Sequence, residues 1–398
     1  MESERRMEPG SPIPQGGIPL SVPEIRGNEW KYIKQCLDTN WVSSVGEFVD
    51  GFEESVASYT GVGFGVAAVN GTAALHIALQ VAGIQPGEEV LVSTLTFISP
   101  ANAIRYIGAW PVFIDAEFDT WQMDPQRVQD FIENQCVIRD GELRNKETNR
   151  RVRAILPVHI LGHPVNMEPI LELAEKYDLV VIEDASEGLG SKYKNMMVGS
   201  MGAIGCFSFN GNKLITTGGG GMIVTNDEAM AQKAKYLTTQ AKDDPLEYVH
   251  NEIGYNYRLV NLLAAMGVAQ MEKLDDFIES KRQIAQRYQK KLTGIPGIKL
   301  MPEASWAYST YWLYTILIDE KVARYGSREI LRKFQEKNIQ TRPLWTPIHL
   351  SPAHKQSSCC GGGVAEMLWK QSLSLPCSVG LQDVEQESVI EFLLQWLS

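Results

Sequence analysis

Lys213 lies in a loop of small residues between two apolar segments that have the composition of buried strands. The first segment covers residues 203–209, and the second, residues 222–225, follows four consecutive glycines. A buried amine loses hydration, which favours its neutral and nucleophilic form. Such an amine can form a Schiff base with a carbonyl group. Glycines let backbone approach a ligand closely, although the same stretch also fits an ordinary surface turn.

A phosphate-binding site is indicated by Asn70-Gly-Thr-Ala-Ala-Leu, which joins a predicted strand to a predicted helix. Small residues at a helix N-terminus leave backbone N–H groups free, and the helix dipole favours an anion there. No Gly-Lys-Ser/Thr follows, so the segment is not a Walker loop. The alternative is that Thr72 is only an ordinary helix cap.

Two further candidates follow predicted strands. Asp184 comes after the strand at residues 179–182, at the edge where open α/β sheets bind ligands. It could hold a protonated pyridine nitrogen, bind magnesium or cap a helix. Phe97 could stack on a flat ring or belong to the core. An anion cradle, a carboxylate, an aromatic ring and a lysine are together the groups that bind pyridoxal phosphate.

Alternating strands and helices must position these groups. We predict strands at 66–69, 89–93, 111–114, 154–158 and 179–182, and helices at 72–82, 99–107, 125–133 and 167–177. Strands and helices at this spacing indicate a mainly parallel sheet with helices on both faces. The polar insertion at 139–151 is expected to form a surface loop or hairpin.

The chain length of 398 residues permits more than one domain. We predict a disordered arm at 1–17 and a large domain at 18–258 that includes N-terminal helices at 23–40 and 52–60. A bridging helical region at 259–295 and a smaller C-terminal α/β domain at 296–398 would follow. The stretch 357–363 has three glycines and suggests a mobile loop.

Composition excludes several classes of protein. A net charge of −11 argues against nucleic-acid binding, and no apolar segment is long enough to span a membrane. The six cysteines contain no CxxC pair, so a reduced, cytoplasmic protein without a zinc site is expected. His159 and His163 are four residues apart, but Gly162 and Pro164 rule out a helix there, so we expect no metal site.

The ordered set of motifs resembles the DegT/StrS family of nucleotide-sugar aminotransferases, which have the aspartate-aminotransferase fold (fold type I). The resemblance extends over nearly the whole chain after the arm. The matching segments are Asn70-Gly-Thr-Ala-Ala-Leu-His, Thr96-Phe, Pro157-Val-His-Ile-Leu-Gly, Ile182-Glu-Asp-Ala, Phe207-Ser-Phe with Lys213, Gly254-Tyr-Asn-Tyr-Arg, Ala264-Ala-Met-Gly-Val-Ala-Gln and Pro347-Ile-His-Leu.

This resemblance implies a three-layer, mainly parallel sheet with a smaller C-terminal domain, and pyridoxal 5'-phosphate as the cofactor. It implies that Lys213 forms the Schiff base and then carries the proton between cofactor and sugar carbons. It also implies that Asp184 pairs with the pyridinium nitrogen and that Phe97 stacks on the ring.

The same resemblance assigns the phosphate contacts. Backbone amides of Thr72 and Ala73 would hold the phosphate, and the hydroxyls of Thr72 and Ser208 would assist. Asn256 would reach the phosphate of the neighbouring subunit, so the active site would require a homodimer.

Two positions depart from the family pattern. The family has Gln or His three residues after the ring aspartate, in contact with the cofactor 3-hydroxyl, whereas this chain has Glu187. The family also has Glu within the glycine run, where this chain has Gly219.

Eight residues are candidates for substrate contacts. For several of them, a structural or interface role is an equally good interpretation. They are Trp41, Ser43, His159, Tyr255, Arg258, Arg342, Trp345 and His349.

The amino-acid sequences of several segments resemble those of a narrower subgroup linked to legionaminic-acid and bacillosamine-type sugars. That resemblance implies amino transfer from L-glutamate, with release of 2-oxoglutarate, to C4 of a UDP-4-keto-6-deoxy-N-acetylhexosamine. Alternatives are a GDP- or dTDP-linked ketosugar, with amination at C3 or C4, or a non-catalytic regulatory relative. Dehydratase relatives have His at the lysine position, so Lys213 argues against that activity.

Overall fold

The structure is a computed structural model that describes residues 16–244 and 246–397. The predicted arm at 1–17 therefore lies outside the described residues, except for Gly16 and Gly17. None of the helices in the described ranges is long and apolar enough to cross a membrane.

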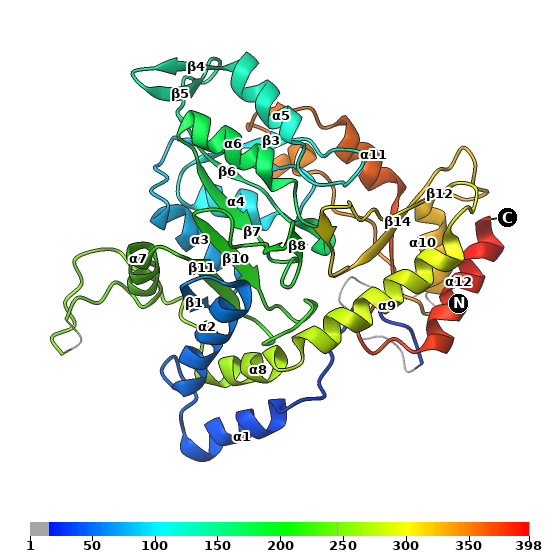
Figure 1. The fold of residues 1–398 in the computed structure, drawn as a ribbon, viewed down its shortest axis with the longest axis horizontal. Helices are drawn as coiled ribbons and strands as arrows, with labels where there is room; N and C mark the ends of the chain where they lie inside the picture. Colours follow the sequence, from blue (N-terminus) through cyan, green and yellow to red (C-terminus); the bar gives the residue numbers. More distant parts are fainter. Residues whose placement is uncertain (1–15, 245, 398) are drawn as a thin grey trace, which may run out of the picture.

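The core of the molecule is an eight-stranded sheet with the order β1-β11-β10-β7-β6-β2-β3-β15 (Figure 1). Neighbouring strands are parallel except at β11, which runs antiparallel to both β1 and β10. The strands are β1 (Phe64–Ala68), β2 (Glu89–Ser93), β3 (Trp110–Ile114), β6 (Val152–Leu156), β7 (Val180–Asp184), β10 (Ile204–Ser208), β11 (Gly221–Thr225) and β15 (Cys359–Cys360).

Helices cover both faces of this sheet, which confirms the predicted three layers. Strand β2 shows why, because Val90 and Val92 pack into the larger core while Leu91 packs into a second cluster on the other face. A strand buried on both faces needs such a continuous apolar run. The helices of this part are α1 (Glu29–Thr39), α2 (Glu47–Thr60), α3 (Gly71–Val81), α4 (Ser99–Tyr106), α5 (Pro125–Asp130), α6 (Met167–Tyr177) and α7 (Glu228–Thr238).

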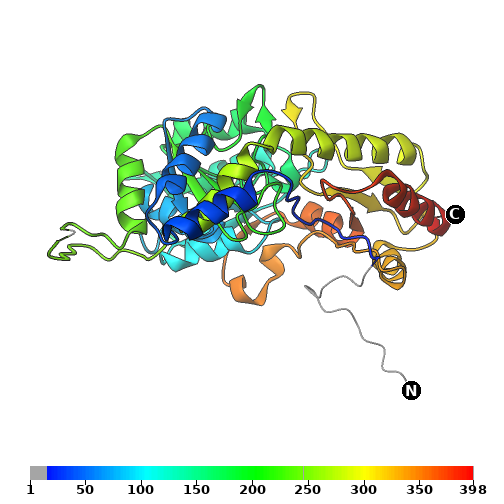
Figure 2. The same ribbon diagram turned by 90° about the horizontal axis from the view of Figure 1, so that it is seen from below.

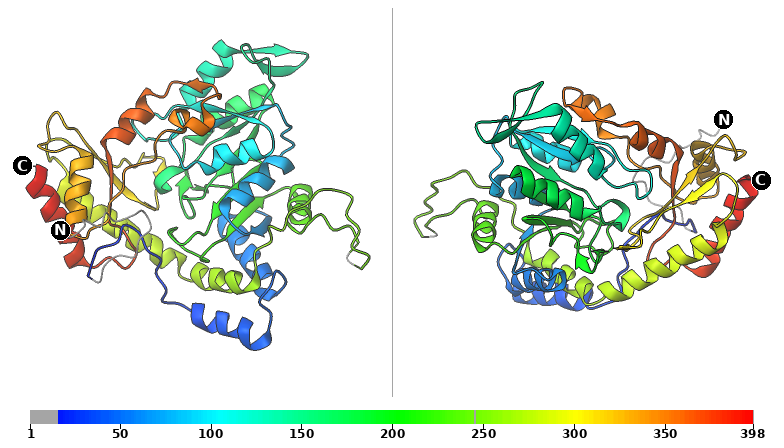
Figure 3. Two further views of the ribbon diagram at one scale, coloured as in Figure 1. Left: turned by 180° about the vertical axis from the view of Figure 1, so that it is seen from behind. Right: turned by 45° about the horizontal axis from the view of Figure 1, so that its top comes forward.

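Two long helices connect the large sheet to a smaller C-terminal unit. Helix α8 (Asn261–Met271) packs against α1 and α2, and α9 (Leu274–Leu292) then runs along the molecule to the small sheet (Figure 3). The antiparallel small sheet has the order β12-β14-β16. The strands of the small sheet are β12 (Ile298–Leu300), β14 (Tyr314–Ile318) and β16 (Ser372–Leu375). The helices of the C-terminal unit are α10 (Ser327–Glu336), α11 (Gly363–Gln371) and α12 (Asp383–Leu397).

The polar insertion forms an antiparallel hairpin, β4 (Cys136–Arg139) and β5 (Glu142–Asn145), as predicted. In a small separate sheet, β13 (Ala307–Tyr308) pairs with β8 (Lys192–Tyr193), which pairs with β9 (Met196–Met197).

Two pairings join parts of the chain that the sequence assigns to different domains. Strand β15 pairs with β3 at the edge of the large sheet, although the sequence predicted a mobile loop there. At the other end of the chain, the Ile18 N–H group donates to the Asn338 carbonyl at 3.0 Å. The first described residues thus pair with the C-terminal unit rather than with the large sheet.

The segment between α7 and α8 projects away from the body of the molecule (Figures 1 and 2). Several of its large apolar side chains are exposed, among them Leu246 and Ile253, each 85% exposed. The surface of α1 has the same character, with Trp30 81% exposed. The buried residues of that helix are Glu29 and Cys36.

Candidate active site

A cleft of about 200 Å³ opens where the carboxyl ends of the parallel strands meet the C-terminal unit. It brings together segments that are far apart in the sequence. Six of the eight residues predicted to bind the cofactor or act in catalysis line it: Thr72, Phe97, Asp184, Glu187, Ser208 and Lys213.

Lys213 lies in the loop between β10 and β11, as predicted. Its N–H group donates to the Asn210 carbonyl at 3.0 Å, which fixes a turn. The ammonium nitrogen lies 3.5 Å from Glu187 Oε1 and 3.9 Å from the centroid of the Trp312 ring. The side chain is only 14% exposed. The amine is thus held between a carboxylate and an aromatic face inside the cleft.

Asp184 is the last residue of β7 and is 4% exposed. Its Oδ1 accepts the Ser186 N–H group at 3.0 Å. Burial raises the pKa of Asp184, and that hydrogen bond only partly opposes the shift. A buried carboxyl of this kind favours a cationic partner, because an unpaired negative charge is costly in the interior.

Glu187 is 7% exposed and faces the same cleft. Its Oε2 accepts the Leu161 N–H group at 2.8 Å. Burial raises the pKa of Glu187 to about 7, although the Lys213 charge and the Leu161 hydrogen bond both oppose the rise. Glu187 therefore changes charge within the neutral range.

The N-terminus of α3 forms an anion cradle beside Ser208. A Cβ atom at Gly71 would lie only 2.8 Å from Ser208 Cβ, so the backbone at this helix start passes close to β10. Asn70 caps the helix, and its Oδ1 accepts the Ala73 N–H group at 2.8 Å. Thr72 lines the cleft, whereas Ala73 does not and its N–H group is already bonded.

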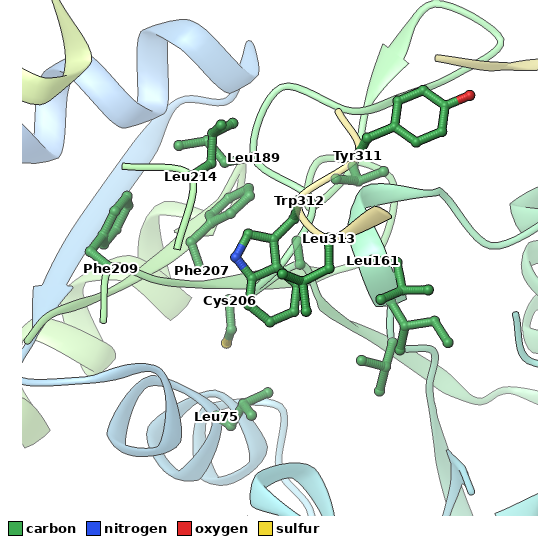
Figure 4. Packing of buried hydrophobic residues seen from close by; sticks show 14 of the residues in the cluster. Leu75, Leu161, Leu189, Cys206, Phe207, Phe209, Leu214, Tyr311, Trp312 and Leu313 are labelled. Carbon is green, nitrogen blue, oxygen red and sulfur yellow. The ribbon is translucent and has the colours of Figure 1, made fainter. Parts of the chain in front are cut away.

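Aromatic side chains form the outer wall of the cleft. Phe97, between β2 and α4, is 56% exposed, and Trp345 is the one predicted substrate residue that lines the cleft. Sequence reasoning missed Trp312, which belongs to the same buried cluster as Cys206 and Phe207 (Figure 4). Its indole N–H donates to the Asn212 carbonyl at 2.7 Å, which links the C-terminal unit to the lysine loop.

Among the polar residues of the cleft, Ser186, Asn210 and Asn212 were not predicted as site residues. Their position next to Asp184 and Lys213 in the sequence is a signal that could have identified them. Trp312 has no such signal, because only the tertiary fold brings it to the lysine.

His159 is not among the residues that line the cleft of its own chain, so its substrate contact stays a prediction. It is fully buried, and its Nδ1 accepts the Val165 N–H group at 3.0 Å. Its Nε2–H group therefore donates to Glu183, also at 3.0 Å. Both ring nitrogens have hydrogen-bond partners in the core, which favours the structural interpretation of His159.

Arg258 is also buried, at 7% exposed, and pairs with the buried Glu53 of α2. Glu53 in addition accepts the Ala67 N–H group at 2.8 Å. This pair joins α2, β1 and the segment that precedes α8. This geometry favours the structural interpretation of Arg258, and its substrate contact stays a prediction.

Arg258→Ala would leave the Glu53 charge buried without its partner. We expect the free energy of unfolding to fall by about 3–5 kcal/mol, measured by urea denaturation. As a control, Arg127→Ala breaks a half-exposed pair with Asp130 and should cost less than about 1 kcal/mol. Unchanged stability with a raised KM for the sugar would instead restore the substrate role.

The remaining predicted substrate residues lie outside the cleft of their own chain. His349 Nδ1 lies 2.7 Å from Thr94 Oγ1, so this ring fastens its loop to the end of β2. The Arg342 guanidinium donates to the Thr341 carbonyl at 3.1 Å. The Tyr255 hydroxyl accepts a hydrogen bond from the Gln80 amide at 2.6 Å.

Trp41 and Ser43 lie in an exposed loop. Asn261 holds this loop, because its side-chain amide donates to the Trp41 carbonyl at 2.7 Å and its backbone N–H group donates to the Ser43 carbonyl at 2.6 Å.

Asn256 is exposed and also lies outside the cleft of its own chain. It forms a bridge with Thr239 at the base of the projecting segment.

These residues fit pyridoxal phosphate. The cradle of α3, with the hydroxyls of Thr72 and Ser208, suits a phosphate group, and the buried Asp184 carboxyl suits a protonated ring nitrogen. The exposed Phe97 ring is available to stack, and the Lys213 amine is within the same cleft. The cofactor's carbonyl group would meet Lys213, its protonated ring nitrogen would meet Asp184, and its phosphate would meet the start of α3 and Ser208.

Comparisons with known proteins identify the family of this chain. The sequence profile of the DegT/DnrJ/EryC1/StrS aminotransferase family matches residues 23–394. EpsN of Bacillus subtilis, named as a putative pyridoxal phosphate-dependent aminotransferase, is 40% identical over 385 residues, which are 95% of each chain. The GDP-perosamine synthase of Escherichia coli O157:H7 is 39% identical over 379 residues, covering 94% of this chain and 98% of that protein.

Among solved structures, a DegT DnrJ EryC1 StrS aminotransferase from Brucella abortus superposes with a TM-score of 0.85 at 28% identity. The match covers 93% of this chain and 95% of that one. The chain therefore belongs to the DegT/DnrJ/EryC1/StrS aminotransferase family and is a pyridoxal phosphate-dependent sugar aminotransferase.

Proposed function

We propose that this aminotransferase transfers an amino group from L-glutamate to the keto carbon, C4, of a GDP-linked 4-ketosugar. The observation that carries the proposal is the cleft in which Lys213, Asp184 and the start of α3 converge. The nucleotide is inferred from the similarity to a GDP-perosamine synthase. The UDP-linked N-acetylhexosamine expected from the sequence is the alternative that the same assay tests.

Pyridoxal phosphate, when bound, supplies a carbonyl carbon that carries the amino group and a ring that withdraws electrons. Lys213 would hold the cofactor and, when its amine is free, move the proton between the two reacting carbons. A free amine beside the reacting carbon is a suitable general base. Trp312 and Glu187 would keep that amine at the wall of the cleft.

Asp184 would keep a positive charge on the ring nitrogen, since a buried carboxylate is stabilised by an adjacent cation. The backbone at the start of α3 and Ser208 would fix the phosphate. Phe97 and Trp345 would exclude water from the outer side of the cleft.

A homodimer with shared active sites would add residues of the partner subunit to a cleft that has little positive charge of its own. Lys213 is the only cation among the cleft-lining residues of the described chain, whereas the ligands would bring a phosphate, a nucleotide diphosphate and the glutamate carboxylates. The exposed apolar side chains of α1 and of the projecting segment are suited to a subunit interface. Asn256, at the base of that segment, would then reach the partner's cradle, and Trp41, Ser43 and Tyr255 could approach the partner's substrate.

Asn256→Asp tests this arrangement. If the side chain lies beside the partner's phosphate, the new negative charge should weaken cofactor retention by about tenfold or more. Retention is measured by dialysis of the loaded enzyme followed by assay of the bound cofactor. Asn251→Asp, in the same projecting segment, serves as the control, and equal retention in both variants would contradict the cross-subunit contact.

The substrate assay uses purified enzyme, pyridoxal phosphate and L-glutamate with GDP-linked or UDP-linked 4-keto-6-deoxy sugars. Mass spectrometry of the sugar and assay of 2-oxoglutarate report the two products. We expect an amino sugar from the GDP-linked substrate. Formation of an amino sugar from the UDP-linked substrate alone would overturn the choice of nucleotide.

A further inference from the structure

Glu187 lies in the cleft at the position where the family resemblance implies a Gln or His in contact with the cofactor 3-hydroxyl. It is the fourth residue of the run Asp184-Ala-Ser-Glu, which starts at the last residue of β7. Its two carboxyl oxygens have different partners: Oε2 accepts the Leu161 N–H group at 2.8 Å, and Oε1 lies 3.5 Å from Lys213 Nζ. The carboxyl is thus fixed on one side and aimed at the lysine on the other.

The surroundings leave this pair few other partners. The Glu187 side chain is 5% exposed and the Lys213 side chain 14% exposed. The titratable groups that face Glu187 are Lys213 and Asp184, and the nearby His159 ring is hydrogen-bonded to Glu183 and to the Val165 N–H group. Two carboxyl groups and one amine in a buried site favour a state in which the groups share protons.

We propose that Glu187 is a positioning residue that holds the free Lys213 amine at the wall of the cleft and shares one proton with it. With the proton on Lys213, the pair is an ammonium and a carboxylate. With the proton on Glu187, the pair is a neutral amine and a carboxylic acid. The transfer needs no third group, and it yields the neutral amine that proton abstraction from carbon requires.

Trp312 completes the arrangement from the other side. Its ring lies 3.9 Å from Lys213 Nζ, which favours the ammonium state through cation–π attraction. The ring is itself fixed by its hydrogen bond to the Asn212 carbonyl. Lys213 therefore has a defined resting position between Glu187 and Trp312 when it is not joined to the cofactor. This inference rests on the role proposed for Lys213.

The test measures the protonation of Lys213 in the cofactor-free protein. Competitive labelling of amines with acetic anhydride across a pH series, read by peptide mass spectrometry, gives the pH midpoint at which Lys213 becomes reactive. Glu187→Gln keeps an acceptor for the Leu161 N–H group but removes the negative charge. We expect its midpoint to lie about one pH unit or more below that of the wild type.

Glu89→Gln is the matched control, because Glu89 is also a buried glutamate paired with a cation, Arg150, but it begins β2 at the opposite end of the sheet. In Glu89→Gln, the pH midpoint for labelling of Lys213 should equal that of the wild type. An unchanged midpoint in Glu187→Gln would overturn the proposal. If Glu187→Gln does not fold, Glu187→Asp, which withdraws the carboxylate from the lysine, should lower the midpoint, and an unchanged midpoint there would be equally decisive.

A second measurement follows the reaction with L-glutamate in the loaded enzyme across pH. The acid limb of its rate should move to lower pH in Glu187→Gln, which a purely structural role would not cause. Borohydride reduction and peptide mapping separate this inference from the proposed function. If the wild type does not fix the cofactor on Lys213, the proposed function fails, whereas the labelling result judges the pairing by itself.

Discussion

Lys213→Ala should lower turnover by about 10⁴-fold or more, because the same amine holds the cofactor and moves the proton. The variant should still bind pyridoxal phosphate, since the start of α3, Ser208 and Asp184 remain in place. Turnover is measured as 2-oxoglutarate released per enzyme, and binding by the cofactor retained after gel filtration. Lys176→Ala, at an exposed lysine of α6, should behave as the wild type.

Normal turnover by Lys213→Ala would remove the central residue of the mechanism. Added primary amines provide a second check, since a small amine that enters the vacated space can act as a base. Partial recovery of the rate with such an amine would support the proton-transfer role over a purely structural one.

Asp184→Asn should reduce turnover by about 10²–10³-fold. The amide can still accept the Ser186 N–H group, but it brings no negative charge to the ring nitrogen. The rate of the reaction with L-glutamate, followed in a stopped-flow spectrometer, is the appropriate measurement. Asp227→Asn, at the N-cap of α7, should leave the rate unchanged.

Stability distinguishes this role from a structural one. Because burial raises the pKa of Asp184 in the cofactor-free fold, its carboxyl favours the folded state at low pH and loses that contribution as the pH rises through its folded pKa. The amide that Asp184→Asn introduces has no charge to bury, so the cofactor-free variant should be at least as stable as the wild type at neutral pH. A strongly destabilised variant would indicate that Asp184 mainly supports the fold.

The sequence could predict the edge of the sheet that carries the site. Lys213, Asp184, Phe97 and Thr72 all follow or precede apolar strand-like segments, and the carboxyl ends of parallel strands meet at one edge. The structure confirms that these four residues line one cleft. Helices α4 and α6 were also predicted within one residue, because their apolar periodicity is regular.

Contacts between distant segments could not be predicted in the same way. Trp312 reaches Lys213 only because α9 carries the chain to the C-terminal unit and the segment before β14 returns it beside the cleft. His159 has a neighbouring sequence typical of the family's substrate side, yet its ring turns into the core to meet Glu183. The apolar residues of α1 follow helical periodicity, but periodicity identifies an apolar face and not what covers it.

The most direct test of the proposed chemistry is the absorbance spectrum of the purified protein with pyridoxal phosphate, before and after addition of L-glutamate. The account predicts a visible band from the cofactor joined to Lys213, lost in Lys213→Ala, that converts to the band of the aminated cofactor when glutamate is added. A protein that forms no such band, or whose band does not respond to any amino donor, would contradict the account.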